Sequence, residues 1–454
     1  MRDLVFVGFL SVLIALGFRR PFVWVLTYAY VDIVSPHHLS YYLLNSVPIS
    51  MIAAAFAIGG WMVMDRKEAI TFAPRQALMA LLLLYAGLTT INADFPTEAA
   101  LKWEWVWKSV FWAIFLPMAL STRLRIEAYL LIMILSAASI VIVGGMKTAV
   151  SGGGYGALNL MVEKNSGLYE SSTISTVAIA IVPIILWLSK HGTIYKRDWM
   201  VRIFAANLVF ACLLIPVGTQ ARTGLVCIAV LAILMLRNVK RRLLYMGLIG
   251  AAALVAIPML PESFTTRMET IQTYEADQSA STRLAVWAWT WDYAKDNPFG
   301  GGFDAYLQNS FRTQIVATPG EAAVQVRDWT VLEDQGRAYH SSYFEMLGEQ
   351  GFPGLFLWLL IHAIGLIRME VLRRGYYHAE GDRAWISPLA SSLQNAQIIY
   401  LVGSLFVGIA FQPFIWMLLA VQIAFDAWVR RSTGEKVRRP FARPKPPAAP
   451  LAEA

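Results

Sequence analysis

The sequence predicts an all-α protein that crosses a membrane many times. Hydrophobic residues make up 57% of the chain and charged residues 15%, whereas a soluble chain carries about 25% charged residues. Several apolar runs can cross the roughly 30 Å hydrocarbon layer of a bilayer, which takes about 20 helical residues. Because backbone N–H and C=O groups find no water in that layer, each such run must be helical. These observations together predict a polytopic integral membrane protein.

Apolar segments follow one another along most of the chain, and we expect them to be the membrane spans. They cover residues 4–18, 21–34, 47–64, 76–91, 103–120, 126–144, 172–189, 199–217, 223–236, 243–260, 352–367, 393–411 and 413–429. The first two segments are short, and only Arg19 and Arg20 separate them. They are two tilted spans or one span with a partial interfacial helix, so we expect twelve or thirteen transmembrane helices.

The basic residues gather in every second connection between these segments. They are Arg19, Arg20, Arg66, Lys67, Arg75, Arg123, Arg125, Lys190, Lys196, Arg197, Arg237, Lys240, Arg241, Arg242, Arg368, Arg373, Arg374, Arg430, Arg431, Lys436, Arg438 and Arg439. The intervening connections hold almost no lysine or arginine. Basic loops stay in the cytoplasm, so this alternation explains the net charge of +8 without a nucleic-acid partner.

One connection is long enough to fold as a small domain. We divide the chain into an N-terminal membrane bundle (1–261), a periplasmic helical loop (262–340), C-terminal spans (341–430) and a disordered cytoplasmic tail (431–454). The alternation of charge places the long connection outside the cytoplasm. Its stretch RLAVWAWTWDYAKD predicts an amphipathic helix, with Leu284, Trp287, Trp291 and Ala294 on one stripe. The following NPFGGGF ends that helix, because proline and glycine break helices.

Several kinds of chemistry lack their motifs. The chain has no P-loop, dinucleotide fingerprint or HExxH, no paired CxxC, and no GxSxG elbow. The outer loop has no D-x-D metal motif, and we expect neither a metal ion nor a cofactor. What remains is a set of arginine and imidazole groups at the outer membrane face.

His340 stands where the long connection meets the next span, at the start of HSSYFEMLGEQGFPG. Imidazole is the side chain whose ordinary pKa suits proton transfer near neutral pH. A lone histidine at a membrane interface can equally be structural, and the residues alone leave both readings open.

Two arginines lie on the outer side, against the positive-inside bias. Arg222, in GTQARTG, sits at a span end, where it is either a snorkelling residue or a clamp for an anion, since guanidinium binds phosphate in a bidentate way. Arg283 begins the amphipathic helix that Ser281 or Thr282 could cap, and a helix N-terminus also favours an anion. The alternative for Arg283 is a solvated surface residue.

Three motifs, in this order, resemble the O-antigen ligase and polymerase superfamily (the Wzy/WaaL class). They are GTQARTG at a span end, S-x-x-R-L-x-x-W leading into NPFGGGF, and the histidine segment from His340 to Leu355. The resemblance covers about 180–420. The N-terminal GFRRPFVWVLTYAYVDIVSPHHLSYY resembles the exosortase-associated O-glycosylation ligases.

The resemblance implies a GT-C-like membrane fold and transfer of a glycan from undecaprenyl diphosphate at the periplasmic face of the bacterial inner membrane. It assigns Arg222 and Arg283 to the diphosphate of the donor and His340 to the base that activates the acceptor hydroxyl, with no metal ion. The reaction then inverts the anomeric carbon.

The identity of the acceptor stays open at this point. We favour a lipid A–core sugar, as in an O-antigen ligase, over a protein hydroxyl or the end of a growing polysaccharide. A transporter of lipid-linked glycans is a different class, which would show internal repeats and broken helices near the midplane. The chain shows no such repeat.

Overall fold

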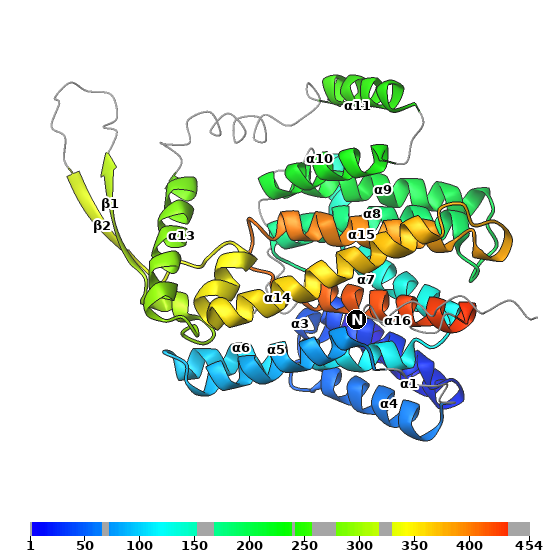
Figure 1. The fold of residues 1–454 in the computed structure, drawn as a ribbon, viewed down its shortest axis with the longest axis horizontal. Helices are drawn as coiled ribbons and strands as arrows, with labels where there is room; N and C mark the ends of the chain where they lie inside the picture. Colours follow the sequence, from blue (N-terminus) through cyan, green and yellow to red (C-terminus); the bar gives the residue numbers. More distant parts are fainter. Residues whose placement is uncertain are drawn as a thin grey trace, which may run out of the picture.

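The computed structural model describes residues 2–65, 72–151, 168–237, 241–256, 278–316 and 329–434. It confirms the predicted fold class, because these residues form a helical bundle with a single β-hairpin (Figure 1). The predicted disordered tail (431–454) lies outside the described residues from 435 onward, whereas residues 431–433 belong to the last helix. Most of the glycine-rich connection between Lys147 and Glu170 also lies outside the described residues.

The helices and strands follow one another in chain order. The N-terminal half contains α1 (Arg2–Arg19), α2 (Phe22–Val34), α3 (Pro36–Leu39), α4 (Ile49–Val63), α5 (Pro74–Ile91), α6 (Pro96–Ala119), α7 (Arg123–Ser151) and α8 (Ser171–His191). Then come α9 (Trp199–Gly218), α10 (Arg222–Leu236), α11 (Arg242–Ala256), α13 (Gln278–Asp296), η2 (Ala305–Gln308), β1 (Ser310–Val316) and β2 (Trp329–Gln335). The chain closes with α14 (Ser342–Gly375), η3 (Gly381–Arg383), α15 (Ile386–Gly403) and α16 (Pro413–Thr433).

Each predicted apolar segment overlaps a helix. Within the described ranges, six helices are long and apolar enough to cross a membrane, namely α5, α7, α8, α9, α14 and α16. Three shorter apolar helices, α2, α4 and α10, accompany them. The total of twelve or thirteen spans stays a prediction.

The centre of the bundle is formed by α8 and α16. Both helices are buried over most of their circumference, which is what a helix with apolar residues on every side requires. The inner helix α8 packs against α9, α10 and α15, whereas α16 packs against α6, α7 and α14. The two helices therefore join the N-terminal and C-terminal halves into one bundle.

Ion pairs tie the basic connections together at one end of the bundle. Arg125 pairs with Asp65 at 2.6 Å, and Arg368 pairs with Asp426 at 2.7 Å. The Arg431 guanidinium donates a hydrogen bond to the carbonyl oxygen of Ser121 at 2.9 Å. We call this the basic end of the bundle and the opposite end, with α13 and the hairpin (Figure 1), the site end.

The long connection is not wholly helical, contrary to the prediction. Strands β1 and β2 pair antiparallel, with Ser310 opposite Gln335 and Val316 opposite Trp329. The predicted stripe on α13 is only partly right: Ala294 is buried and Trp287 half-buried, whereas Leu284 is 57% and Trp291 49% exposed. The reason is that LAVWAWTW carries apolar side chains around the whole helix, so spacing alone cannot identify the packed face.

The segment predicted as a span at 393–411 is displaced in the structure. Helix α15 begins at Ile386 and ends at Gly403, and residues 404–412 run on without helical structure. Side chains of α14 and α15 satisfy this backbone: Ser342 Oγ donates to Val407 O at 2.9 Å and Tyr400 donates to Ile409 O at 2.9 Å. Non-helical backbone is tolerated at membrane depth where it lines a cavity, and residues 406–412 line one.

Candidate functional site

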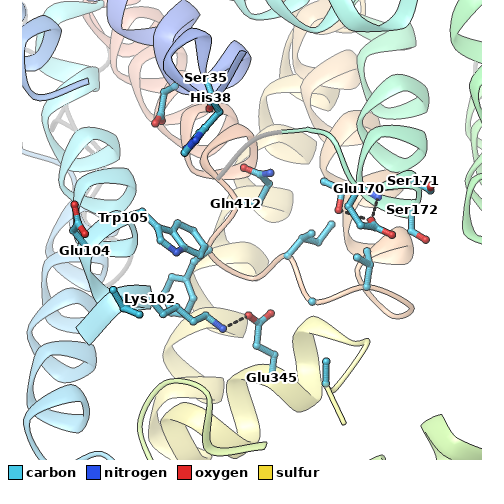
Figure 2. Close-up of a pocket in the computed structure, with 18 of the residues that line it drawn as sticks. Ser35, His38, Lys102, Glu104, Trp105, Glu170, Ser171, Ser172, Glu345 and Gln412 are labelled. Atoms are coloured by element: carbon cyan, nitrogen blue, oxygen red, sulfur yellow. Dashed lines mark hydrogen bonds and ion pairs between the residues drawn. The ribbon is translucent and has the colours of Figure 1, made fainter. Parts of the chain in front are cut away.

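A cavity of about 1180 Å³ opens at the site end of the bundle. Arg222, Arg283 and His340 all line it, although they come from α10, α13 and the junction before α14. The structure therefore brings the three predicted site residues together. Figure 2 shows Lys102 and Trp105 of α6 on one side of this cavity, with Glu170, Ser171 and Ser172 across from them.

Arg222 owes its position to a break between two helices. Helix α9 ends at Gly218 and α10 begins at Arg222 itself, with Gln220 between them in the left-handed region at φ 54°. The two helices approach each other closely at this turn, and only glycine fits at position 224, because a side chain there would meet the ring of Pro216 at about 2.5 Å. Arg222 thus stands at the N-terminus of α10, the positive end of the helix dipole, and its half-buried side chain lines the cavity. This arrangement is suited to binding an anion.

Arg283 lies inside a helix and not at its first turn. Helix α13 already includes Gln278, so the expectation that Ser281 or Thr282 caps it is wrong; the polar residues before Arg283 continue the helix because none of them is a helix breaker. One turn later, Trp287 donates from its indole N–H to Tyr339 O at 2.8 Å and stacks on Phe344 at 5.1 Å. That anchor ties Arg283 to the segment that carries His340.

His340 occupies an unusual backbone position. Its φ of 48° lies in the left-handed region, which non-glycine residues adopt uncommonly and mostly where the surroundings enforce it. Partial burial, Arg283 and Arg337 lower the pKa of the imidazole below its ordinary 6.5, and Glu170 opposes them. The ring is therefore neutral at neutral pH and able to accept a proton.

A buried ion cluster lies next to these three residues. Lys102 Nζ contacts Glu345 Oε1 and Glu349 Oε1, each at 2.7 Å, and stands 3.9 Å from Asp304 Oδ1. Burial raises the pKa of Asp304, although Lys102 opposes that shift. One cation thus faces three carboxylates, and removing it would leave buried charges uncompensated, which typically costs about 3–5 kcal/mol.

The sequence reasoning missed Lys102. It did consider Glu345 and Glu349, as residues that orient or pack, and both are held by this lysine. A signal was present, since Lys102 precedes a span on the side that otherwise carries almost no basic residue. Arg222 was singled out by that same departure from the positive-inside pattern.

The glycines of NPFGGGF bring two motifs into backbone contact. Gly301 N donates to Gly348 O at 3.0 Å and Gly302 N donates to Glu349 O at 2.9 Å. Gly300 has a φ of 84° and a side chain there would meet Glu349 O. The motif therefore contacts the first turns of α14, which carry Glu345 and Glu349 of the ion cluster.

No group of three or more histidine, cysteine, aspartate or glutamate side chains is placed to hold a metal ion in the described part of the chain. Lys102 lies among the carboxylates of Asp304, Glu345 and Glu349. Metal-independent transfer stays a prediction.

Two family models match the chain, and the cavity draws on both. Residues 206–359 match the family described as O-antigen ligase, and this range contains Arg222, Arg283 and His340. Residues 1–193 match a family of unknown function (DUF5935), and this range contains Lys102 and Trp105. No curated protein matches the chain.

Proposed function

We propose that this chain, whose residues 206–359 match the family described as O-antigen ligase, transfers an O-antigen glycan from undecaprenyl diphosphate to a lipid A–core sugar at the periplasmic face of the inner membrane. The observation that carries this proposal is the meeting of Arg222, Arg283 and His340 in one cavity of a multi-pass membrane protein. Two fixed cations beside a neutral base are the groups that transfer from a lipid diphosphate needs.

The proposed reaction moves one proton and exchanges one bond. The acceptor hydroxyl gives its proton to His340, and its oxygen attacks the anomeric carbon on the face opposite the diphosphate. The bond between that carbon and the diphosphate oxygen breaks, and undecaprenyl diphosphate leaves. Arg222 and Arg283 stabilise the negative charge that develops on the leaving group, and such fixed charges act most strongly in the transition state.

Two alternatives keep this chemistry and change the acceptor: a protein O-glycosylation ligase and a polysaccharide polymerase. Transport of a lipid-linked glycan is less favoured, because Arg222, Arg283 and His340 gather at one end of the bundle and not at its midplane.

The orientation of the cavity can be tested by cysteine labelling. Gln308 is exposed and lies at the site end of the bundle, and both native cysteines are buried. Gln308→Cys should react with a membrane-impermeant thiol reagent in cells whose outer membrane is permeabilised. His378→Cys, in the exposed connection after α14, is the matched control and should react only after the inner membrane is lysed. The reverse pattern would overturn the orientation.

The donor and the acceptor can be tested with purified protein in vitro. We expect transfer from undecaprenyl-diphosphate glycan to lipid A–core, with or without excess EDTA, and no transfer from a nucleotide sugar. The acceptors should be offered in turn: lipid A–core, a serine-containing protein and the free glycan. Transfer to the protein or the glycan alone would select one of the two alternatives, and activity that requires added Mg²⁺ or Mn²⁺ would contradict metal-independent transfer.

A further inference from the structure

The cavity has a second wall that the proposed mechanism does not use. Its residues all come from the part of the chain that matches the family of unknown function. They lie within residues 31–51 and 101–108, among them Asp32, Ser35, His37, His38, Lys102 and Trp105. We call this set the N-terminal wall. A ligand pocket typically measures about 300–1,000 Å³, so a cavity of about 1180 Å³ has room for a second reactant beside the donor.

The N-terminal wall contains polar atoms that lack a partner. Asp32 Oδ2 and His37 Nδ1 are buried, and neither has a hydrogen-bond partner among the described residues. Buried polar atoms are nearly always paired, and leaving one unpaired costs roughly 1–3 kcal/mol. Burial, the neighbouring His38 imidazole and the positive charge of Lys108 lower the pKa of His37 to about 4, so its ring is neutral at neutral pH. Both atoms can therefore exchange a hydrogen bond with a ligand hydroxyl, which donates as well as accepts.

An aromatic side chain lies in the same wall. Trp105, on α6, is half-buried and lines the cavity near Lys102 (Figure 2). His38 and Ser35 enter the cavity from the direction of α2 and α3 (Figure 2). A sugar ring offers an apolar face that packs on an indole and several hydroxyl donors at its edge, whereas a serine or threonine offers one hydroxyl. Two unpaired polar atoms beside an aromatic ring therefore fit the sugar better.

We propose that the N-terminal wall is the acceptor subsite and that it binds a saccharide through Asp32, His37 and Trp105. This inference rests on the proposed function, because it assumes that the opposite side of the cavity holds the donor. The wall places the acceptor hydroxyl opposite His340 and gives residues 1–193 a role in choosing the acceptor.

The test separates acceptor binding from donor chemistry. Three readouts are taken on the purified protein: binding of undecaprenyl diphosphate, slow hydrolysis of the glycan donor by water, and transfer to lipid A–core at varied acceptor concentration. Asp32→Asn and Trp105→Ala should each raise the acceptor KM about 2- to 10-fold. A hydrogen bond contributes roughly 0.5–1.5 kcal/mol, and loss of the indole removes the surface on which the sugar ring packs. Donor binding and donor hydrolysis should stay within about twofold of the unaltered protein.

Trp107→Ala is the matched control, because Trp107 lies on the same helix but does not line the cavity; it should leave all three readouts unchanged. An unchanged acceptor KM in both wall variants would overturn the proposal. So would a parallel loss of donor binding, which would assign the wall to the donor. If the unaltered protein transfers glycan only to a serine-containing peptide, the saccharide class is wrong. If it neither binds nor hydrolyses the donor, the proposed function fails first.

Discussion

Replacing His340 with alanine should lower the rate of glycan transfer by about 10²–10⁴-fold, the contribution typical of a positioned general base. His340 lines the cavity together with Arg222 and Arg283, and its lowered pKa keeps the imidazole neutral and ready to accept the acceptor proton. Donor binding should be largely retained, because a neutral ring contributes little to holding a diphosphate. The measurement is single-turnover transfer beside a donor-binding titration.

The control for this variant is His378→Ala, which removes an exposed histidine in the connection after α14 and should leave transfer unchanged. If His340→Ala transfers at a near-normal rate, or fails only because the donor no longer binds, His340 is not the base. Glu345 is a poor substitute, since Lys102 holds its carboxylate at 2.7 Å.

The pH dependence of transfer gives a second readout of His340. The proton-accepting form is neutral, so activity should be present above the histidine pKa and should fall as the pH drops through it. Because that pKa is lowered, the acidic limb should lie below pH 6.5. Arg337→Gln removes a positive charge and should move the limb to higher pH, whereas Glu170→Gln should move it to lower pH. The shift from Arg337 should be the smaller one, since Arg337 is exposed and screened by salt, whereas Glu170 is half-buried in the cavity wall.

Alanine at Arg222 or Arg283 should weaken donor binding and lower transfer by roughly 10²–10³-fold, as removal of one group that stabilises a developing anion does. Both guanidinium groups are half-buried in the cavity wall, where water screens their charge less than at the surface. Lysine should rescue either variant poorly, because it keeps the charge but loses the bidentate geometry. The measurement is the dissociation constant of undecaprenyl diphosphate, followed by the transfer rate.

Arg337→Ala is the control for these two variants, because Arg337 is exposed and does not line the cavity. It should leave the dissociation constant of the donor unchanged. Unchanged donor binding in both Arg222→Ala and Arg283→Ala would reduce these residues to surface charges.

Hydropathy and charge predicted the helices well because both can be evaluated for each segment without knowing which segments it packs against. The displaced α15 shows the limit of this approach. In YLVGSLFVGIAF the apolar run continues after Ser404, so hydropathy extends the predicted span past the end of the helix at Gly403. What holds residues 404–412 in place is hydrogen bonding from Ser342 and Tyr400, and these partners are set by packing.

The candidate site was predictable only where a residue stands out in its own segment. Arg222 and His340 were found because a basic residue on the outer side and an imidazole at a span junction stand out locally. The role of Lys102 is visible only from its contacts with Glu345 and Glu349, which lie more than 240 residues away in the chain. The N-terminal wall depends on α2, α3 and α6 meeting around one cavity. Such contacts are properties of the packed bundle and leave only weak traces in the sequence.

The central claim is that this cavity holds the diphosphate of a lipid-linked donor. The most direct measurement is an experimental structure of the protein in lipid with undecaprenyl diphosphate bound. The account predicts both phosphates within about 3 Å of the guanidinium nitrogens of Arg222 and Arg283, with the lipid tail leaving between helices at the site end. A diphosphate bound at the basic end, or in the cavity without contact to either arginine, would contradict it.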